Sequence, residues 1–222
     1  MCGRFSLRGD PRVIADEFEV DEIPEIPRRF NIAPTTPIAS IRVDAHTAKR
    51  ELTFMRWGLV PAWADDPKIG ARMINARCET IDEKNSFKHP FKRKRCLVIA
   101  DGFYEWQTTE LGKRPFFIHK TDDRPFGFAA IWDHWGRDGG EFESAAIITT
   151  DPNALMKPIH DRMPVILGRE DYAAWLDPNW NDVASLKALL RACSPDGWEA
   201  YPVASVVNNP RNDVGACIER VA

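Results

Sequence analysis

The feature that most constrains the fold is a series of short β-rich runs through the middle of the chain, each bounded by turn residues. Alternating or β-branched stretches cover residues 38–43, 51–57, 96–100, 115–119, 127–132 and 142–150, and later strands are expected at 164–167 and 203–207. These patterns follow the two-residue period of strands. The glycine-rich stretch 136–140 predicts a hairpin turn. The chain therefore has to fold around a sheet whose strands are joined mainly by hairpins.

Helices are expected to be few, short and peripheral. An Asp-Pro pair at 10–11 supplies a cap and a first-turn proline for a helix over 12–18, and a second pair precedes an expected helix over 153–157. Spaced apolar residues predict an amphipathic helix over 181–192. We therefore predict an α+β fold with a mixed or antiparallel, barrel-like β core.

The composition is that of an ordinary globular protein. A hydrophobic share of 44% and a charged share of 28% exclude disordered and fibrous classes. The 17 prolines are dispersed, and no repeat or linker marks a boundary, so we expect a single domain over residues 1–222. Rossmann and P-loop folds are disfavoured because strands and helices do not alternate and no glycine-rich phosphate loop is present.

The expected location is the reduced cytoplasm. No apolar run approaches the roughly 18 residues of a membrane span, and the amino terminus lacks the hydrophobic stretch of a signal peptide. Five cysteines without paired short spacings argue against a secreted disulfide framework. We expect a monomer with no membrane partner.

The charge is unevenly distributed. The formal net charge is −3, yet residues 68–95 hold nine basic side chains against three acidic ones, a local charge of +6. Such a sector is either a solvated basic face or a phosphate-contacting surface. Neighbouring aromatic residues keep the second interpretation open.

The sharpest chemical feature is Cys2. Removal of the initiator methionine is expected before a residue this small, and it would leave an α-amine and a thiol on one residue. Their ordinary pKa values are about 8 and 8.5, so both are partly available as nucleophiles near neutral pH. The amine can act as the thiol's base, as in N-terminal nucleophile hydrolases, or condense with an aldehyde to an imine that the thiol closes to a thiazolidine. An incidental terminal cysteine is the alternative.

Three further residues are candidates with ordinary structural alternatives. Glu105 stands between two aromatic residues beyond an apolar strand, where its pKa could be raised for acid–base chemistry, or it is a plain loop glutamate. His160 lies in a stiff loop between two prolines, although a lone histidine is more often structural. Asn75 could orient a nucleophile or cap a following helix.

A metal site is not expected. The histidines and cysteines show neither a two-residue cysteine spacing nor a His-Glu-x-x-His pattern. Core thiols explain Cys78 and Cys96. No cofactor is implied.

Seven ordered blocks resemble the SOS-response-associated peptidase (SRAP) family across essentially the whole chain. They are MCGRF at 1–5, FNIAPTTP at 30–37, RWGLVPAW at 56–63, INARCET at 74–80, RCLVIADGFYEW at 95–106, HDRMPVIL at 160–167 and VVNNPRN at 206–212.

The resemblance implies capture of abasic sites in single-stranded DNA through a covalent thiazolidine crosslink, with an associated β-elimination (lyase) activity. The implied catalytic set is a nucleophile, an orienting amide, an acid–base carboxyl and a histidine that assists imine formation and reversal: Cys2, Asn75, Glu105 and His160. The implied DNA contacts are phosphate ligands, a polar contact and residues that stack on or wedge against bases: Arg4, Arg77, Arg162, Thr149, Trp106, Pro34 and Trp63.

Two other functions stay open at this stage. An N-terminal nucleophile amidohydrolase or peptidase would also begin Met-Cys-Gly, but its four-layer sandwich would need more regular helices. A noncovalent single-strand binding module would show salt-sensitive binding without preference for abasic DNA.

Overall fold

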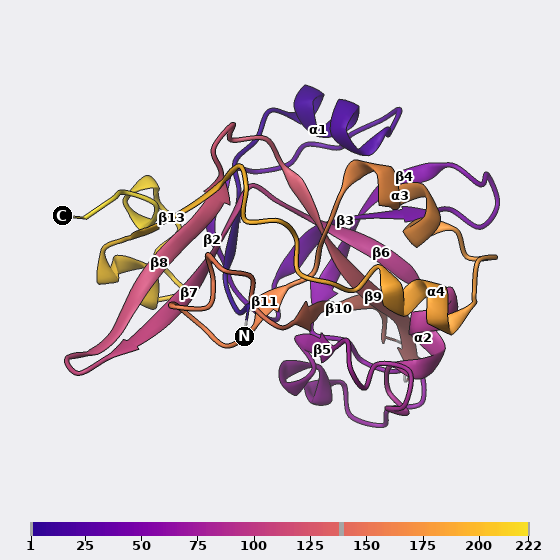
Figure 1. The fold of residues 1–222 in the computed structure, drawn as a ribbon. Helices are drawn as coiled ribbons and strands as arrows, with labels where there is room; N and C mark the ends of the chain where they lie inside the picture. Colours follow the sequence, from indigo (N-terminus) through magenta and orange to yellow (C-terminus); the bar gives the residue numbers. More distant parts are fainter. Residues whose placement is uncertain (1, 138–139, 222) are drawn as a thin grey trace.

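Five strands close into a barrel in the computed structural model, which describes residues 2–137 and 140–221 (Figure 1). The long hairpin of β9 and β10 closes the ring, because β9 also pairs with β6 and β10 also pairs with β4. Only the β10–β4 pairing within the ring is parallel, so the barrel is mixed. In ring order the strands are β10 (Gly140–Thr150), β4 (Arg50–Trp57), β3 (Pro37–Val43), β6 (Arg95–Ala100) and β9 (Phe126–Arg137).

The strand β6 shows why its sequence is apolar without alternation. All six of its residues are buried. Helix α3 (Arg169–Leu176) packs on β6, and Trp175 Nε1 of that helix donates to the carbonyl of Cys96 at 2.9 Å. A strand covered on both faces has no position for a solvent-facing polar residue.

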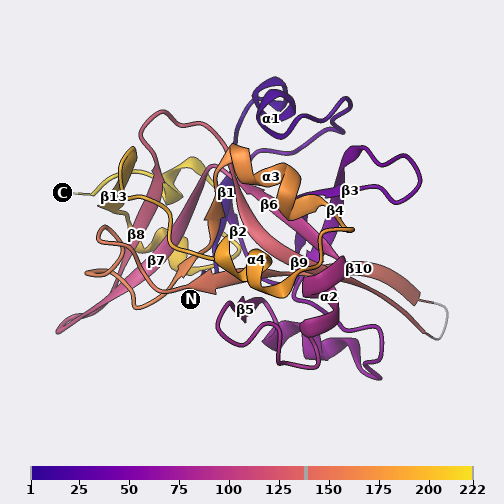
Figure 2. The same cartoon turned by 45° about the vertical axis from the view of Figure 1, so that its right-hand side comes forward.

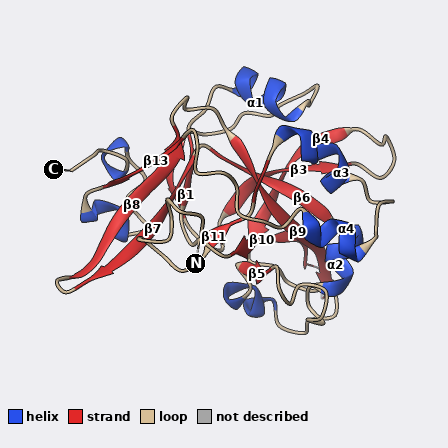
Figure 3. Ribbon diagram, viewed as in Figure 1, coloured by secondary structure: helices blue, strands red, loops and turns tan. Residues whose placement is uncertain are grey.

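A second, antiparallel sheet stands beside the barrel (Figure 3). Phe5 on its strand β1 packs on Trp57 and Phe128 of the barrel, with ring centroids 5.1 and 5.8 Å away. These contacts join both sheets to one apolar core. The strand order is β13 (Trp198–Pro202), β8 (Gly112–Lys120), β7 (Gly102–Thr109), β1 (Phe5–Leu7) and β2 (Arg29–Ile32).

Short strands extend the barrel wall near the amino terminus. β5 (Asn75–Arg77) runs parallel to β10, and β11 (Met163–Pro164) pairs with the end of β10. β12 (Ile166–Leu167) pairs with β9.

The remaining helices are short and lie outside the sheets (Figures 1 and 2). None of the helices in the part of the chain described here is long and apolar enough to cross a membrane. They are α1 (Pro11–Phe18), α2 (Lys88–Arg93), α4 (Val183–Ala188) and the 3-10 turns η1 (Pro67–Arg72), η2 (Ser205–Asn208) and η3 (Gly215–Cys217).

The predicted α+β fold with a barrel-like core is confirmed, and α1 begins after its Asp10 cap as expected. Three element predictions are wrong. Residues 154–159 form turns in place of the helix expected over 153–157: Asn153 caps a first turn by accepting from the Met156 N–H, but Pro158 has no backbone N–H to continue the helical pattern. The late strand ends at Pro202 and is followed by η2, and the helix expected over 181–192 spans only Val183–Ala188. The predicted hairpin joins β9 and β10, although its residues 138–139 lie outside the described residues.

Candidate functional site

Pairing of β1 with β7 brings the start of the chain beside Glu105. Phe5 lies opposite Phe103, and the Tyr104 N–H donates to the carbonyl of Arg4 at 3.0 Å. Continuing this register toward the amino terminus sets Gly3 opposite Glu105, so Cys2 is one residue away, close enough for its thiol to interact with the Glu105 carboxylate. Cys2 is 0% exposed, and burial, followed by the adjacent Glu105 carboxylate, raises the pKa of its thiol far above the usual range.

Glu105 follows the apolar strand β6 as expected and lies within strand β7, so the alternative of a plain loop glutamate is wrong. Its side chain is 2% exposed, and this burial raises its pKa to about 7. Because desolvation penalises the carboxylate, the acid and the carboxylate coexist near neutral pH. A group poised in this way can both donate and accept a proton in one reaction cycle.

His160 faces Glu105, with Nε2 3.8 Å from Oε2 of the carboxyl. The Arg162 N–H donates to Nδ1 of His160 at 3.0 Å, so the neutral ring carries its proton on Nε2, toward Glu105. Asp161 Oδ1 also lies 3.0 Å from Nδ1, so protonation of that nitrogen would replace the backbone contact with an ion pair. Burial lowers the pKa of His160, which favours the neutral ring.

Asn75 is held in strand β5, where it aligns with Ile147 of β10. It does not cap a helix. Its Nδ2 donates to the carbonyl of Cys2 at 2.9 Å, which anchors the first residues of the chain against the barrel. The same strand pairing sets Thr149 opposite Arg77, so β5 and β10 deliver three expected site residues together.

Several polar atoms at this place lack hydrogen-bond partners among the described residues. They include Asn75 Oδ1, Thr149 Oγ1 and Arg162 Nε, all of which are buried. Buried polar atoms are normally satisfied, and each exception costs about 1–3 kcal/mol. The cluster is therefore a place where a polar ligand can supply the missing partners.

The three expected arginines differ in how far they are committed to the fold. Arg162 is bound to both carboxylate oxygens of Glu79, at 2.6 and 2.9 Å, and donates to the carbonyl of Thr149. Arg4 donates to Asn31 Oδ1 at 2.9 Å and to the Val207 carbonyl at 2.8 Å. Arg77 is exposed.

A cleft of about 420 Å³ joins four of the expected residues to two that the sequence analysis missed. Trp106 Nε1 donates to Asn208 Oδ1 at 2.7 Å across this cleft. Asn208 belongs to one of the family-like blocks and could have been found there, whereas Lys113 lies in a hairpin that carries no such signal. The lining residues are Arg4, Glu105, Trp106, Lys113, His160 and Asn208.

Two expected base contacts lie elsewhere. Pro34 is half-buried in the loop between β2 and β3, and Trp63 is 55% exposed between β4 and η1. Neither is among the described residues that line the cleft.

Seven of the nine basic side chains of the sector 68–95 are exposed, and the other two, Lys94 and Arg95, are committed to the fold. Arg95 is only 3% exposed and donates to backbone carbonyls of Phe91, Trp175 and Trp180. Lys94 forms an ion pair with Asp133 at 2.7 Å. Arg95 therefore ties α2 and α3 to the barrel.

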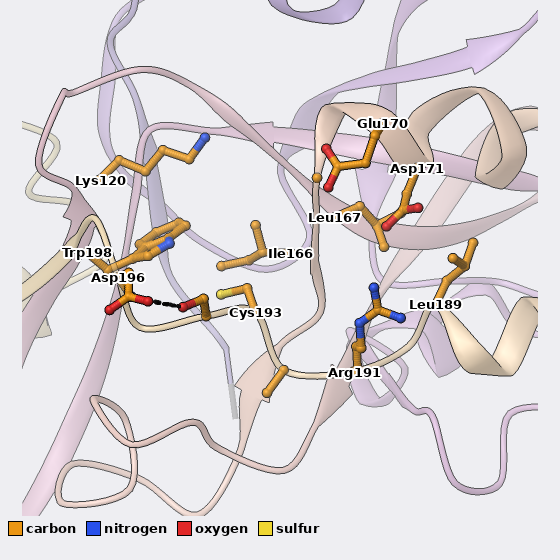
Figure 4. A pocket seen from close by; sticks show the side chains of 13 residues that line it. Lys120, Ile166, Leu167, Glu170, Asp171, Leu189, Arg191, Cys193, Asp196 and Trp198 are labelled. Atoms are coloured by element: carbon orange, nitrogen blue, oxygen red, sulfur yellow. Dashed lines mark hydrogen bonds between the residues drawn. The ribbon is translucent and has the colours of Figure 1, made fainter.

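A separate cavity of about 290 Å³ lies between β8, β13 and α3 (Figure 4). Lys120, Glu170 and Arg191 are among its charged lining residues, and none of the expected site residues lines it. No group of three or more histidine, cysteine, aspartate or glutamate side chains in the described ranges is arranged to hold a metal ion.

Comparison with known proteins assigns the chain to a family. The model of the SOS response associated peptidase (SRAP) family matches residues 1–210, and the chain belongs to this family. It is similar to the abasic site processing protein YoqW of Bacillus subtilis, with 42% identity over 99% of both chains. The mouse abasic site processing protein HMCES is 38% identical over 79% of this chain and 58% of the relative's length.

Solved structures share the architecture. A protein from Bacteroides thetaiotaomicron superimposes with a TM-score of 0.88 at 27% identity and covers 100% of both chains. A phage-related protein from Bordetella bronchiseptica has a TM-score of 0.72 at 31% identity, over 91% of this chain and 94% of the other.

Proposed function

We propose that this protein processes abasic sites in single-stranded DNA by forming a covalent thiazolidine crosslink through Cys2. The observation that carries the proposal is the meeting of Cys2, Glu105 and Asn75 at one place, with Nε2 of His160 3.8 Å from the Glu105 carboxyl. The names of the similar proteins support abasic sites as the substrate class.

The first stage is imine formation. With residue 1 removed, the α-amine of Cys2 adds to the aldehyde carbon of the ring-opened sugar. The resulting carbinolamine loses water once its hydroxyl is protonated. Glu105, with a pKa of about 7, is suited to donate this proton near neutral pH. Asn75 holds the carbonyl of Cys2 and so fixes the direction of the amine.

The second stage is ring closure. The Cys2 sulfur adds to the imine carbon, the thiol proton leaves, and the imine nitrogen gains a proton, which gives a five-membered ring. Because burial keeps the thiol protonated, a neighbouring base has to receive that proton. Glu105 as carboxylate, with His160 behind it, can take the proton and return it for reversal.

The imine also explains an associated lyase activity. Its electron-withdrawing carbon acidifies the neighbouring C2′ position, and loss of that proton expels the 3′ phosphate by β-elimination. Fast thiol closure competes with this path, so the position of the buried thiol decides the partition between crosslink and strand cleavage.

The DNA is held by cations and aromatic faces around the lesion. Arg77 is exposed beside Asn75, and Arg4 and Trp106 line the cleft next to Glu105. An abasic site has no base to unstack, so its sugar enters such a cleft at little cost. Thr149 and Arg162 offer the unfilled polar atoms to the sugar–phosphate.

The test is a denaturing gel of the protein mixed with a single-stranded oligonucleotide that contains one abasic site. The expected result is a shifted band that survives denaturation, with no such band for Cys2→Ala. Cys96→Ala is the matched control, since Cys96 is equally buried but lies in the barrel. An undiminished crosslink by Cys2→Ala would refute the mechanism.

The amidohydrolase alternative finds less support. The closed barrel differs from a four-layer sandwich, and the chain belongs to the SRAP family. Turnover of glutamine or peptides without reaction with abasic DNA would favour that alternative. Equal, noncovalent binding of intact and abasic strands would favour a binding module.

A further inference from the structure

The β7–β8 hairpin projects from the rest of the molecule and ends in a tight turn (Figures 1 and 2). The two strands pair without interruption from Phe103 opposite Ile118 to Thr109 opposite Gly112, which leaves a two-residue turn. Thr109 Oγ1 donates to the Gly112 carbonyl at 2.8 Å, and Gly112 adopts a φ of 114°, a region that favours glycine. The hairpin tip is therefore a defined, closed element.

The turn displays an apolar side chain to solvent. Leu111 is fully exposed, and the distal residues of both strands around it are exposed as well. Turns of this length favour glycine, asparagine and aspartate. Neither the turn geometry nor the core requires a leucine here, so its presence points to a contact with another molecule.

One face of the hairpin runs from the cleft to the tip. Trp106 pairs with Pro115 and Thr108 with Lys113, so Trp106 and Lys113 share a face and are separated by about 7 Å along the strands. Lys113 lines the cleft together with Glu105 and His160. It also lines a second hollow of about 720 Å³, whose wall includes Leu111 and Val203.

We propose that the distal half of this hairpin is a second DNA-contact site, in which Lys113 holds a backbone phosphate and Leu111 packs on a nucleobase beside the lesion. The inference rests on the proposed function, because Lys113 lines both the hollow and the cleft in which the abasic sugar would bind. Lys113 and Arg114 against Glu110 leave the tip with one net positive charge, which suits phosphate. An apolar side chain can pack on any base, so the contact is independent of sequence.

The geometry sets the reach of this site. Thr109 lies three residues beyond Trp106, about 10 Å along the strand. A stacked strand advances about 3.4 Å per nucleotide, so the tip lies roughly three nucleotides from the lesion. The hairpin can therefore contact the DNA on only one side of the abasic site, either the 5′ or the 3′ side.

The experiment compares covalent product formation on three single-stranded oligonucleotides with one abasic site. One has eight nucleotides on both sides, and the others keep one nucleotide on the 5′ or the 3′ side. The variants are Leu111→Ser, Lys113→Gln and the double substitution. Val13→Ser in α1 and Lys49→Gln in the β3–β4 turn are matched controls, because both residues are exposed and these elements lie away from the hairpin (Figure 1).

The expected result is that the double variant reacts at least about fivefold more slowly than wild type on the long oligonucleotide at subsaturating protein. On the oligonucleotide trimmed on the contacting side, wild type and variant react equally. Lys113→Gln also makes the fall of log rate with log salt concentration shallower, by about 0.7 in slope. Both controls behave as wild type.

The inference would be overturned if the double variant reacted at the wild-type rate on the long oligonucleotide. It would also be overturned if the variant lost the same fraction of its rate on all three oligonucleotides. If wild type formed no covalent product at all, the proposed function would fail instead. Fluorescence anisotropy with the same three oligonucleotides then still tests the hairpin, because the double variant should bind the long one more weakly and the trimmed one equally.

Discussion

At the scale of single residues, the buried carboxyl of Glu105 links acid–base chemistry to stability. Burial holds its pKa at about 7 in the folded protein, against an ordinary value of 4.5. The folded state therefore binds more protons than the unfolded chain between these values, and the free energy of unfolding falls as the pH rises through this window. The carboxylate is retained in an unfavourable place, as expected of a functional group.

We predict that Glu105→Gln stabilises the protein at pH 8 by up to about 3 kcal/mol and has little effect at pH 4, where the native carboxyl is already neutral. Urea unfolding at both pH values measures the difference. The variant should also lose most of its crosslinking rate near pH 7. Equal stabilisation at pH 4 and pH 8 would contradict the titration of Glu105.

Asn75 tests positioning separately from chemistry. Asn75→Ala removes the 2.9 Å hydrogen bond to the Cys2 carbonyl. A lost hydrogen bond of about 1 kcal/mol corresponds to roughly a fivefold slower crosslinking rate. The measurement is the single-turnover rate, with Asn85→Ala as a control at an exposed position. Unchanged rates for Asn75→Ala would remove its role in orienting residue 2.

At the scale of elements, the loop after η2 is fastened to β2 by one buried amide. Asn31 Nδ2 donates to the carbonyls of Val207 and Asn212, and Asn31 Oδ1 accepts from Arg4. Asp213 in turn accepts from the Asn31 N–H at 2.9 Å. Together these contacts hold Arg4 and the Asn208 loop against the cleft.

We predict that Asn31→Ala destabilises the fold by about 1–3 kcal/mol, because it leaves buried carbonyls and the Arg4 guanidinium with fewer partners. Thermal unfolding measures the loss. Crosslinking at a temperature where the variant is folded should be slower as well, since Asn208 and Arg4 line the cleft. Asn179→Ala, at an exposed loop position, serves as the control.

The same scale shows what the sequence could and could not predict. The β-rich runs of β3 and β4 and the unbroken apolar run of β6 are sufficient to predict these strands. The pairing of β1 with β7 could not be located, because three residues carry no period, and this pairing is what sets Cys2 beside Glu105. Residue chemistry made Cys2 a candidate and the resemblance added the DNA contacts, whereas the place of Lys113 in the cleft emerged only from the three-dimensional structure.

At the scale of the whole molecule, a net charge of −3 coexists with a local cationic cleft. Within the sector 68–95, Arg95 adds no charge to the surface, since it is buried among backbone carbonyls, whereas seven other basic side chains of the sector are exposed. The exposed cations, among them Arg77 and Lys113, are the ones available to steer DNA.

We therefore predict that substitution of one arginine of that sector changes stability alone and substitution of another changes DNA binding alone. Arg95→Met should lower the free energy of unfolding by about 2–4 kcal/mol, because it leaves several buried carbonyls unpaired, with no change in the salt dependence of DNA binding. Arg77→Gln should leave stability unchanged and reduce the salt slope by about 0.7. Calorimetry and anisotropy titrations over salt separate the two outcomes.

The most direct test of covalent capture is an intact-mass measurement of the protein with and without a single-stranded abasic oligonucleotide. The account predicts a free protein that lacks residue 1 and an adduct whose mass is that of protein plus oligonucleotide minus one water, formed by wild type and absent for Cys2→Ala. An adduct of that mass on Cys2→Ala, or on protein that retains its initiator methionine, would contradict it.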